Sequence, residues 1–520
     1  MAPGFCHNSL LGAYLETINF PWLTLAVAWF ITTVALLGLK GGSVKVSAEG
    51  EIMNTLESLL VAIAPTGESR EIFNPATGAL VGLAPVHTVD DLEKAVSEAQ
   101  KAQNGWAALG HAARSEIMLK VADAVDVHAE ALAQLLTREQ GKPLNGPNAR
   151  FEVGGASAWL RAAASTPLET EILIEGENGR SEMTYRPIGV VGAISPWNWP
   201  MMIVMWQISP ALRMGNAVVA KPSEFTPLSV LALVAVMNTV LPAGLVTVVS
   251  GDREIGARLS SHPAIGKVIF TGSTATGKAI IRSSADTVKR LTLELGGNDA
   301  GIVLPDVDPK AIAEGLFWGA FINSGQTCTC LKRLYVHDSV FDEVVAELTA
   351  IAGAMPMGEG TNEKNVLGPL QNKQQFDIVS RLVDSARKGG GRVVLGGNPD
   401  TSKPGFFYPT TLVADVPNDN ALVQEEQFGP ALPIIRYTNI EDAIAMANAV
   451  DVGLGASVWS ADRSKAMAVA VRIEAGTVWI NSHGGVNPMV PFGGAKQSGY
   501  GLQFGVEGLK ALGVPQVIRG

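Results

Sequence analysis

Short apolar runs alternate with amphipathic stretches through the middle of the chain. The runs 246–250, 267–272 and 301–306 have the length and composition of buried strands. The stretches 252–261 and 309–322 have the polar and apolar spacing of helices. Strand, helix and strand at this spacing predict right-handed βαβ units, and therefore an α/β fold with a parallel sheet covered by helices.

Further runs extend the pattern to both sides. Residues 188–200 and 216–224 are two more buried-strand runs, each ending in a polar, turn-forming tip. Ligands of open α/β sheets lie at the carboxyl ends of the strands, so these tips are candidate site segments. Helices are predicted over 88–109, with Thr88 as N-cap, and over 112–140. A third block of alternation, 384–480, predicts a second α/β domain.

The N-terminus departs from this pattern. Residues 20–39 carry no charge and are long enough to cross about 30 Å of hydrocarbon. As a membrane anchor, this segment would leave the rest of the chain in the cytoplasm, because Lys40 and Lys45 follow it. The alternative is that the protein begins at Met53 and that residues 1–52 are never made.

Composition narrows the class of protein. The chain has 520 residues, 47% hydrophobic and 17% charged, which predicts a well-packed protein of more than one domain. Its net charge of −10 argues against a nucleic-acid partner. Three cysteines cannot build a disulfide framework, so a reducing compartment is expected.

Two polar segments could bind a nucleotide. "FTGSTATGKA" (270–279) sets Gly272 and Ser273 between a strand and a helix, where backbone N–H groups could receive a phosphate. The alternative is an ordinary βα turn. Lys221 and Glu224 end another strand, and a carboxylate there could accept from ribose hydroxyls, unless the two form only a solvated ion pair.

Cys328 and Cys330 stand in a glycine-containing turn after a predicted helix. Two cysteines without a nearby histidine do not make a zinc site, and a disulfide between them would be strained. A buried small hydrophobe and a reactive nucleophile remain open. Glu294 ends an apolar strand, where partial desolvation would suit a general base, and the glycines that follow it favour this interpretation over the alternative of an edge carboxylate facing water.

Seven motifs taken together identify a family. The chain resembles the aldehyde dehydrogenase superfamily from about Met53 to the C-terminus. The motifs stand in family order: "PWNWP" (196–200), "KPSE" (221–224), "FTGSTATG" (270–277), "LELGGN" (293–298), "GQTC" (325–328), "EEQFGP" (425–430) and "PFGGAKQSG" (491–499).

The resemblance implies a Rossmann-like NAD-binding domain, an α/β catalytic domain and a small β arm for oligomerisation, in a homodimer or homotetramer. The boundaries expected are an N-terminal extension 1–52, an NAD-binding domain 53–161 and 185–296, a catalytic domain 297–480, and an arm 162–184 and 481–520.

The resemblance also implies the chemistry. Cys328 would be the nucleophile, Asn198 an oxyanion donor and Glu294 the base that activates water, with no metal. NAD is favoured over NADP because the Glu224 carboxylate would repel a 2′-phosphate. The residues expected around the cofactor are Ser195, Trp197, Lys221, Glu224, Gly256, Gly272, Ser273, Gly277, Glu426 and Phe428.

Some residues depart from the family pattern. Leu502 and Gln503 stand where an arginine and a glutamate are common, and Trp199 replaces a phenylalanine or tyrosine. Bulky apolar residues follow Trp199: Met201, Met202, Ile203, Met205 and Trp206. Residues of this set that line a substrate tunnel would favour an apolar or aromatic aldehyde. The alternative is that they pack in the core. The rival functions are an NADP-using semialdehyde dehydrogenase, a non-catalytic membrane-tethered member of the family, and a C-x-C metal-binding protein.

Overall fold

A computed structural model describes residues 54–177 and 179–520. The candidate anchor 20–39 and the alternative of a start at Met53 lie outside these described residues. Within the described residues, no helix is long and apolar enough to cross a membrane.

A six-stranded sheet forms the first half of the fold, in the order β19-β9-β8-β5-β6-β7. Its five longer strands are parallel, and β19 pairs antiparallel with β9. The strands are β5 (Val190–Ile194), β6 (Ala217–Lys221), β7 (Val246–Val248), β8 (Ile265–Thr271), β9 (Arg290–Glu294) and β19 (Gly499–Tyr500). The predicted strands at 246–250 and 267–272 are confirmed as β7 and β8.

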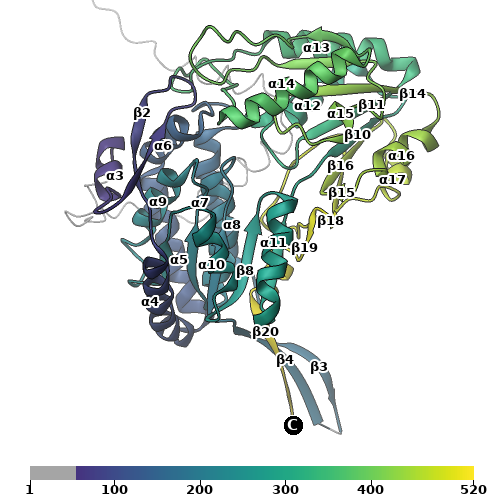
Figure 1. Cartoon of the computed structure of the whole chain (residues 1–520). Helices are drawn as coiled ribbons and strands as arrows, with labels where there is room; N and C mark the ends of the chain where they lie inside the picture. Colours follow the sequence, from purple (N-terminus) through teal and green to yellow (C-terminus); the bar gives the residue numbers. More distant parts are fainter. Residues whose placement is uncertain (1–53, 178) are drawn as a thin grey trace, which may run out of the picture. The chain divides into compact units, whose positions relative to one another are not determined.

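Helices cover this sheet, and Figure 1 shows α8 and α10 beside β8. The helices of this half are α3 (Leu56–Ala62), α4 (Val89–Ala108), α5 (Gly110–Val127), α6 (Ala129–Gln140), α7 (Ala149–Ser165), α8 (Pro200–Arg213), α9 (Pro227–Met237), α10 (Arg253–Ser261), α11 (Thr274–Ser284) and the 3-10 turn η2 (Ala285–Thr287). The single helix predicted over 112–140 is wrong. It divides at His128, whose ring Nδ1 lies 2.6 Å from the carbonyl oxygen of Ala124 and whose backbone leaves the helical conformation.

A seven-stranded sheet forms the second half, in the order β12-β13-β14-β11-β10-β16-β17. All neighbours pair in parallel except β12 and β13. Its strands are β10 (Asp299–Val303), β11 (Leu331–His337), β12 (Arg392–Leu395), β13 (Thr411–Ala414), β14 (Ala431–Tyr437), β16 (Gly455–Trp459) and β17 (Thr477–Ile480). The predicted second α/β unit is therefore present, but its sheet begins at β10, well before residue 384, because β10 and β11 form its centre.

Alternate side chains of these strands enter two apolar cores. Ile302 and Tyr335 belong to one core, while Leu334 and Val336 belong to the other. The helices of this half are α12 (Pro309–Phe321), α13 (Phe341–Ala354), α14 (Lys373–Lys388), α15 (Ala421–Gln424), α16 (Ile440–Asn448) and α17 (Arg463–Ala470), with the 3-10 turns η3 (Ile322–Gly325) and η4 (Asp338–Val340).

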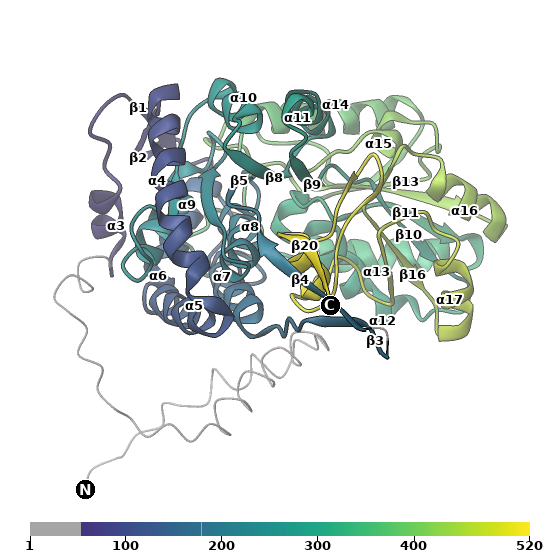
Figure 2. The same cartoon turned by 90° about the horizontal axis from the view of Figure 1, so that it is seen from below.

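A three-stranded antiparallel sheet, in the order β20-β4-β3, projects beyond the first half (Figures 1 and 2). It consists of β3 (Glu171–Gly176), β4 (Gly179–Pro187) and β20 (Gly513–Arg519). The remaining elements are the pairs β1 (Ser69–Phe73) with β2 (Leu80–Pro85) and β15 (Val452–Gly453) with β18 (Ala495–Lys496), and helix α18 (Gly505–Lys510). The functional boundaries expected from the sequence stay a prediction.

Candidate active site

Glu294 is the last residue of β9 and is almost fully buried. It pairs across the sheet with Thr271 on β8 and with Gly499 on β19. Gly499 has φ +118°, and a Cβ there would lie 1.8 Å from the carbonyl oxygen of Leu293, so only glycine permits this close pairing.

Neither carboxylate oxygen of Glu294 has a hydrogen-bond partner among the described residues. Burial raises the pKa of Glu294 well above its ordinary value of 4.5. The alternative of an edge carboxylate facing water is therefore wrong for this structure. A buried carboxyl group without partners is neutral at rest and free to take part in proton transfer.

Cys328 lies in the turn between η3 and β11. Asn323 and Ser324 have left-handed backbone angles (φ 51° and 55°), and Gly325 follows with φ 76°. A Cβ at Gly325 would lie 2.3 Å from the carbonyl oxygen of Gly429. This tight turn delivers Cys328 to a partly exposed position, against the apolar cluster of Leu454, Phe492 and Phe504.

The two cysteines differ in their surroundings. Cys330 is buried at 1% exposure, and its thiol lies 3.8 Å from the carbonyl oxygen of Ile322. Cys328 is partly exposed. Burial raises the pKa of the Cys328 thiol to about 12, although the positive charge of Lys332 acts in the opposite direction. Among the described residues, no group of three or more histidine, cysteine or acidic side chains could hold a metal.

Asn198 follows β5 and reaches the Cys328 loop. Its side-chain amide donates to the carbonyl oxygen of Gln326 at 2.9 Å. Next to it, the Trp199 indole donates to the Thr327 hydroxyl at 2.8 Å. The structure thus brings Asn198 and Cys328 together from segments 130 positions apart. An amide NH₂ group has two N–H donors, and this contact uses one of them.

Sequence reasoning missed the pair that holds this loop. The ammonium group of Lys142 donates to the Asn198 carbonyl oxygen at 2.8 Å and to Glu152 at 2.5 Å, and it lies 3.5 Å from the centroid of the Trp199 ring. Glu152 also accepts from the backbone N–H groups of Met201 and Met202 at the start of α8. Lys142 lies in the loop after α6 and Glu152 on α7, ten positions apart, so the sequence carried no signal for their contact.

The expected adenosine residues gather at the carboxyl ends of β5, β6 and β8. Lys221 ends β6, is buried, and donates to the carbonyl oxygen of Pro222 at 3.1 Å. Glu224 is exposed in the following turn. A Cβ at Gly256 would lie 3.5 Å from the Lys221 side chain, so α10 passes close to it. Ser195, just beyond β5, is buried and its hydroxyl oxygen has no hydrogen-bond partner within 54–177 and 179–520.

The glycine-rich segment precedes α11. Ser273 is the N-cap of α11, and its hydroxyl oxygen accepts from the backbone N–H of Thr276 at 3.3 Å. Side chains of Phe270 and Leu295 fill the space that a Cβ at Gly272 or Gly277 would need. The Ser273 side chain thus caps the helix, and the two glycines are required for packing, whether or not a phosphate binds.

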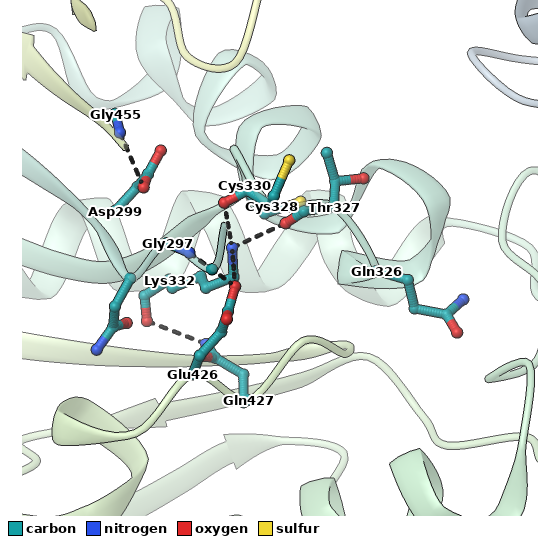
Figure 3. Close-up of polar contacts among 12 residues, drawn as sticks. Gly297, Asp299, Gln326, Thr327, Cys328, Cys330, Lys332, Glu426, Gln427 and Gly455 are labelled. Carbon is teal, nitrogen blue, oxygen red and sulfur yellow. Dashed lines mark hydrogen bonds and ion pairs between the residues drawn. The ribbon is translucent and has the colours of Figure 1, made fainter. Parts of the chain in front are cut away.

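Figure 3 shows Glu426 and Lys332 beside the Cys328 loop. Glu426 accepts from the backbone N–H of Gly297 at 3.3 Å and lies 3.3 Å from the ammonium group of Lys332. The ring of Phe428 meets the Trp197 ring edge to face, with centroids 5.4 Å apart. Lys332 and Glu426 are therefore charged groups next to the nucleophile candidate.

Most of the apolar residues that follow Trp199 pack in the interior. Met201 and Met205 belong to the main core, and Met202 and Ile203 pack in a small cluster with Trp199. Trp206 differs, because its ring lies 4.9 Å from Phe504 in the aromatic cluster that includes Cys328.

Two mostly parallel sheets, a partly exposed cysteine, a buried carboxyl group and polar strand ends fit the class of dinucleotide-dependent oxidoreductases. The donor set at the strand ends fits such a cofactor: a lysine and carboxylates for hydroxyls, a free buried hydroxyl at Ser195, and a helix N-terminus. The family model of the aldehyde dehydrogenase family matches residues 63–517, and the chain belongs to that family.

Known proteins agree with this assignment. Aldehyde dehydrogenase LUC3 of Fusarium sp is 38% identical, over 84% of this chain and 92% of its own length. Phenylacetaldehyde dehydrogenase of Pseudomonas fluorescens is 37% identical, over 86% of this chain and 91% of its own. The structure of an aldehyde dehydrogenase from Bacillus cereus in complex with NAD+ has a TM-score of 0.84 at 34% identity, covering 88% of this chain and 94% of that one.

The resemblance to aldehyde dehydrogenases and the α/β fold expected from the sequence are therefore confirmed. The chain is an NAD(P)-dependent enzyme that oxidises an aldehyde to its carboxylic acid.

Proposed function

We propose that the enzyme oxidises an apolar or aromatic aldehyde through a thioester on Cys328. The observation that carries this proposal is that the Asn198 amide contacts the Cys328 loop and that the charge of the buried Glu294 acts on the Cys328 thiol. Each comes from a different part of the chain, and each has the chemistry that one stage of the reaction requires.

Cys328 is the nucleophile in this proposal. As a thiolate it attacks the aldehyde carbon, and the carbonyl oxygen becomes an oxyanion. The second N–H of the Asn198 amide and the backbone N–H of Cys328 stabilise that oxyanion, an interaction worth about 3 kcal/mol per donor. The thiol must first lose its proton to solvent water, because burial raises its pKa to about 12, and Cys328 is partly exposed.

Glu294 is the general base for the second stage. Its unpartnered, buried carboxyl group has a raised pKa, so its carboxylate form, once the proton has left, is a stronger base than an ordinary carboxylate and can take a proton from water. The hydroxide so formed attacks the thioester and releases the acid and the Cys328 thiolate. Cys330 takes no part, because it is buried and faces a backbone carbonyl.

NAD fits the strand ends better than NADP. Bound NAD supplies the hydride acceptor. Lys221 and Glu224 would hold the adenosine ribose, and Glu426 and Phe428 would face the nicotinamide ribose. Glu224 is exposed at the tip of the turn, where its negative charge would oppose a 2′-phosphate.

The substrate class follows from the aromatic cluster around Cys328. Trp206 lies 5.5 Å from Trp159 and 4.9 Å from Phe504, and Phe504 stacks with Phe492 at 5.9 Å. Such a lining favours an aromatic or long apolar group over a charged one. The similar proteins named for phenylacetaldehyde and geranial support this class.

The experiment is NADH formation by the purified full-length chain with phenylacetaldehyde, geranial, acetaldehyde and succinic semialdehyde, each with NAD and NADP. We expect kcat/KM to be highest for the two apolar substrates with NAD, and turnover to be lost in Cys328→Ala. Preference for succinic semialdehyde with NADP would favour the semialdehyde dehydrogenase. Turnover that survives in Cys328→Ala would overturn the mechanism.

We further propose that the three-stranded arm joins subunits of a homodimer or homotetramer. Its surface exposes apolar side chains that a second copy would cover: Ile172, Leu173, Ile174, Val517 and Ile518. Light scattering of the protein and of an Ile174→Glu variant tests this, since the variant is expected to dissociate. A cytoplasmic location agrees with the free thiols of Cys328 and Cys330, and cell fractionation tests it.

A further inference from the structure

Lys332 is a buried lysine at the second position of β11, four residues after the nucleophile candidate. Its ammonium group donates to the carbonyl oxygens of Thr327 at 2.8 Å and Cys328 at 2.7 Å. On its other side it forms an ion pair with Glu426 at 3.3 Å. Figure 3 shows this ammonium group between the Cys328 loop and Glu426.

We propose that Lys332 is a positioning residue that serves two sites at once: it fixes and electrostatically activates Cys328, and it holds Glu426 in place for the cofactor. This inference rests on the proposed roles of Cys328 as nucleophile and Glu426 as a cofactor-binding residue.

The charges facing Cys328 act in opposite directions. Lys332 on β11 favours the thiolate. Glu426, Asp299 on β10 and Glu294 on β9 oppose it. Asp299 in turn lies 3.7 Å from the imidazole of His483.

Lys332 keeps its charge in this setting. Burial works against the ammonium form, but Glu426 and Asp299 raise the pKa of Lys332 above its ordinary value. The lysine is therefore positively charged at every pH at which the enzyme would work. Its charge is the largest influence that favours the Cys328 thiolate.

The test measures alkylation of Cys328 by iodoacetamide near pH 8, where the rate follows the thiolate fraction. In Lys332→Met we expect the rate to fall about tenfold, because loss of a neighbouring positive charge raises a thiol pKa by about one unit. In Glu426→Gln we expect the rate to rise about threefold, because an opposing negative charge is removed. Tryptophan fluorescence during titration with NAD should show weaker binding in both variants.

Opposite changes in the alkylation rate of Lys332→Met and Glu426→Gln distinguish an electrostatic effect from a loosened structure. A loosened structure would expose Cys328 and speed alkylation in both variants. Lys267→Met is the matched control, because Lys267 is also buried on a strand and donates to a backbone carbonyl, that of Ala511 at 2.9 Å. We expect it to alkylate at the wild-type rate. Cys328→Ala gives the background from the other thiols.

A wild-type or faster alkylation rate in Lys332→Met would overturn the proposal. Should that variant fail to fold, Glu426→Gln decides alone, and an unchanged or slower rate there would overturn it. Alkylation needs no aldehyde, so this result is independent of whether the proposed oxidation is found.

Discussion

Glu152 and Glu294 are both buried acidic residues in the first half of the fold, yet only the side chain of Glu152 has hydrogen-bond partners among the described residues. Glu152 on α7 accepts from Lys142 and from two backbone N–H groups at the start of α8. Glu294 at the end of β9 has no partner for either oxygen among the residues that the structure describes. Burial is common to both, so unsatisfied hydrogen bonding, rather than burial, distinguishes Glu294, the proposed general base, from Glu152.

The Glu152 region explains how the site is held. Lys142 carries the effect of Glu152 to the Asn198 carbonyl, where the Asn323 side chain also donates at 2.9 Å. The fully paired Glu152 thus helps to fix Asn198, the proposed oxyanion donor. The unpaired Glu294 is left free to move a proton.

The largest effect expected is on turnover in Glu294→Gln. An amide cannot accept the proton of water, so steady-state NADH formation should fall about a thousandfold. Attack by Cys328 does not need this base, so one equivalent of NADH per active site should still form in a burst. Stopped-flow absorbance and mass spectrometry of the acylated protein measure both stages. A variant with normal steady-state turnover would show that Glu294 is not the base.

Glu152→Gln should instead lower stability. Lys142 would lose its counter-ion in a buried place, where desolvation lowers the pKa of its ammonium group to about 8 even with Glu152 present, and removing one partner of a buried pair costs about 3 kcal/mol. Glu139→Gln is the matched control, because Glu139 is also buried and accepts from the first N–H groups of α9, at Leu228 and Ser229, and no cation of the described part of the chain pairs with it. Urea unfolding should show a clearly smaller loss for the control. An equal loss of stability in Glu152→Gln and Glu139→Gln would mean that the ion pair with Lys142 adds no stability of its own.

Asn198→Ala tests the group that Glu152 and Lys142 hold. Loss of one oxyanion donor should lower kcat about a hundredfold while KM for the aldehyde changes little. Steady-state kinetics with the best aldehyde measure this. An effect confined to KM would assign Asn198 to substrate binding alone.

The raised pKa of Glu294 predicts how stability depends on pH. Between the ordinary carboxyl pKa and the raised one, the folded protein holds a proton that the unfolded chain has lost. Stability therefore falls as the pH rises through this window, by up to about 1.4 kcal/mol per pH unit. Urea unfolding at pH values from 5 upward should show the wild type losing stability relative to Glu294→Gln. A difference in stability between the wild type and Glu294→Gln that does not change with pH would mean that the pKa of the Glu294 carboxyl group is near its ordinary value.

The smallest effect is expected at Glu425, the neighbour of Glu426. Its carboxylate is half-exposed and pairs with Arg381 at 2.6 Å. Exposed pairs contribute about 1 kcal/mol or less, so Glu425→Gln should leave stability and NAD binding nearly unchanged. Fluorescence titration beside Glu426→Gln sharpens the contrast between a solvated and a buried carboxylate. Weaker NAD binding in Glu425→Gln would contradict the prediction that the exposed carboxylate has little effect.

Much of the fold could be predicted because its signals are local. The apolar runs that became β7 and β8 are bounded by turn residues. The helix prediction over 112–140 failed at His128, where one side chain competes for a helix carbonyl that no periodicity reveals. The apolar residues after Trp199 share one helix, and only packing separated Met201 in the core from Trp206 beside Cys328.

The sequence by itself determined the family and the candidate chemical groups, because each motif is a short, contiguous set of residues at a strand end. Tertiary structure decided which groups are paired. The partners of Asn198 and of Glu426 come from distant segments, Lys142 and Lys332 respectively. The energy of a buried charge depends on the atoms around it, and those atoms are brought together only when the two sheets and their helices pack.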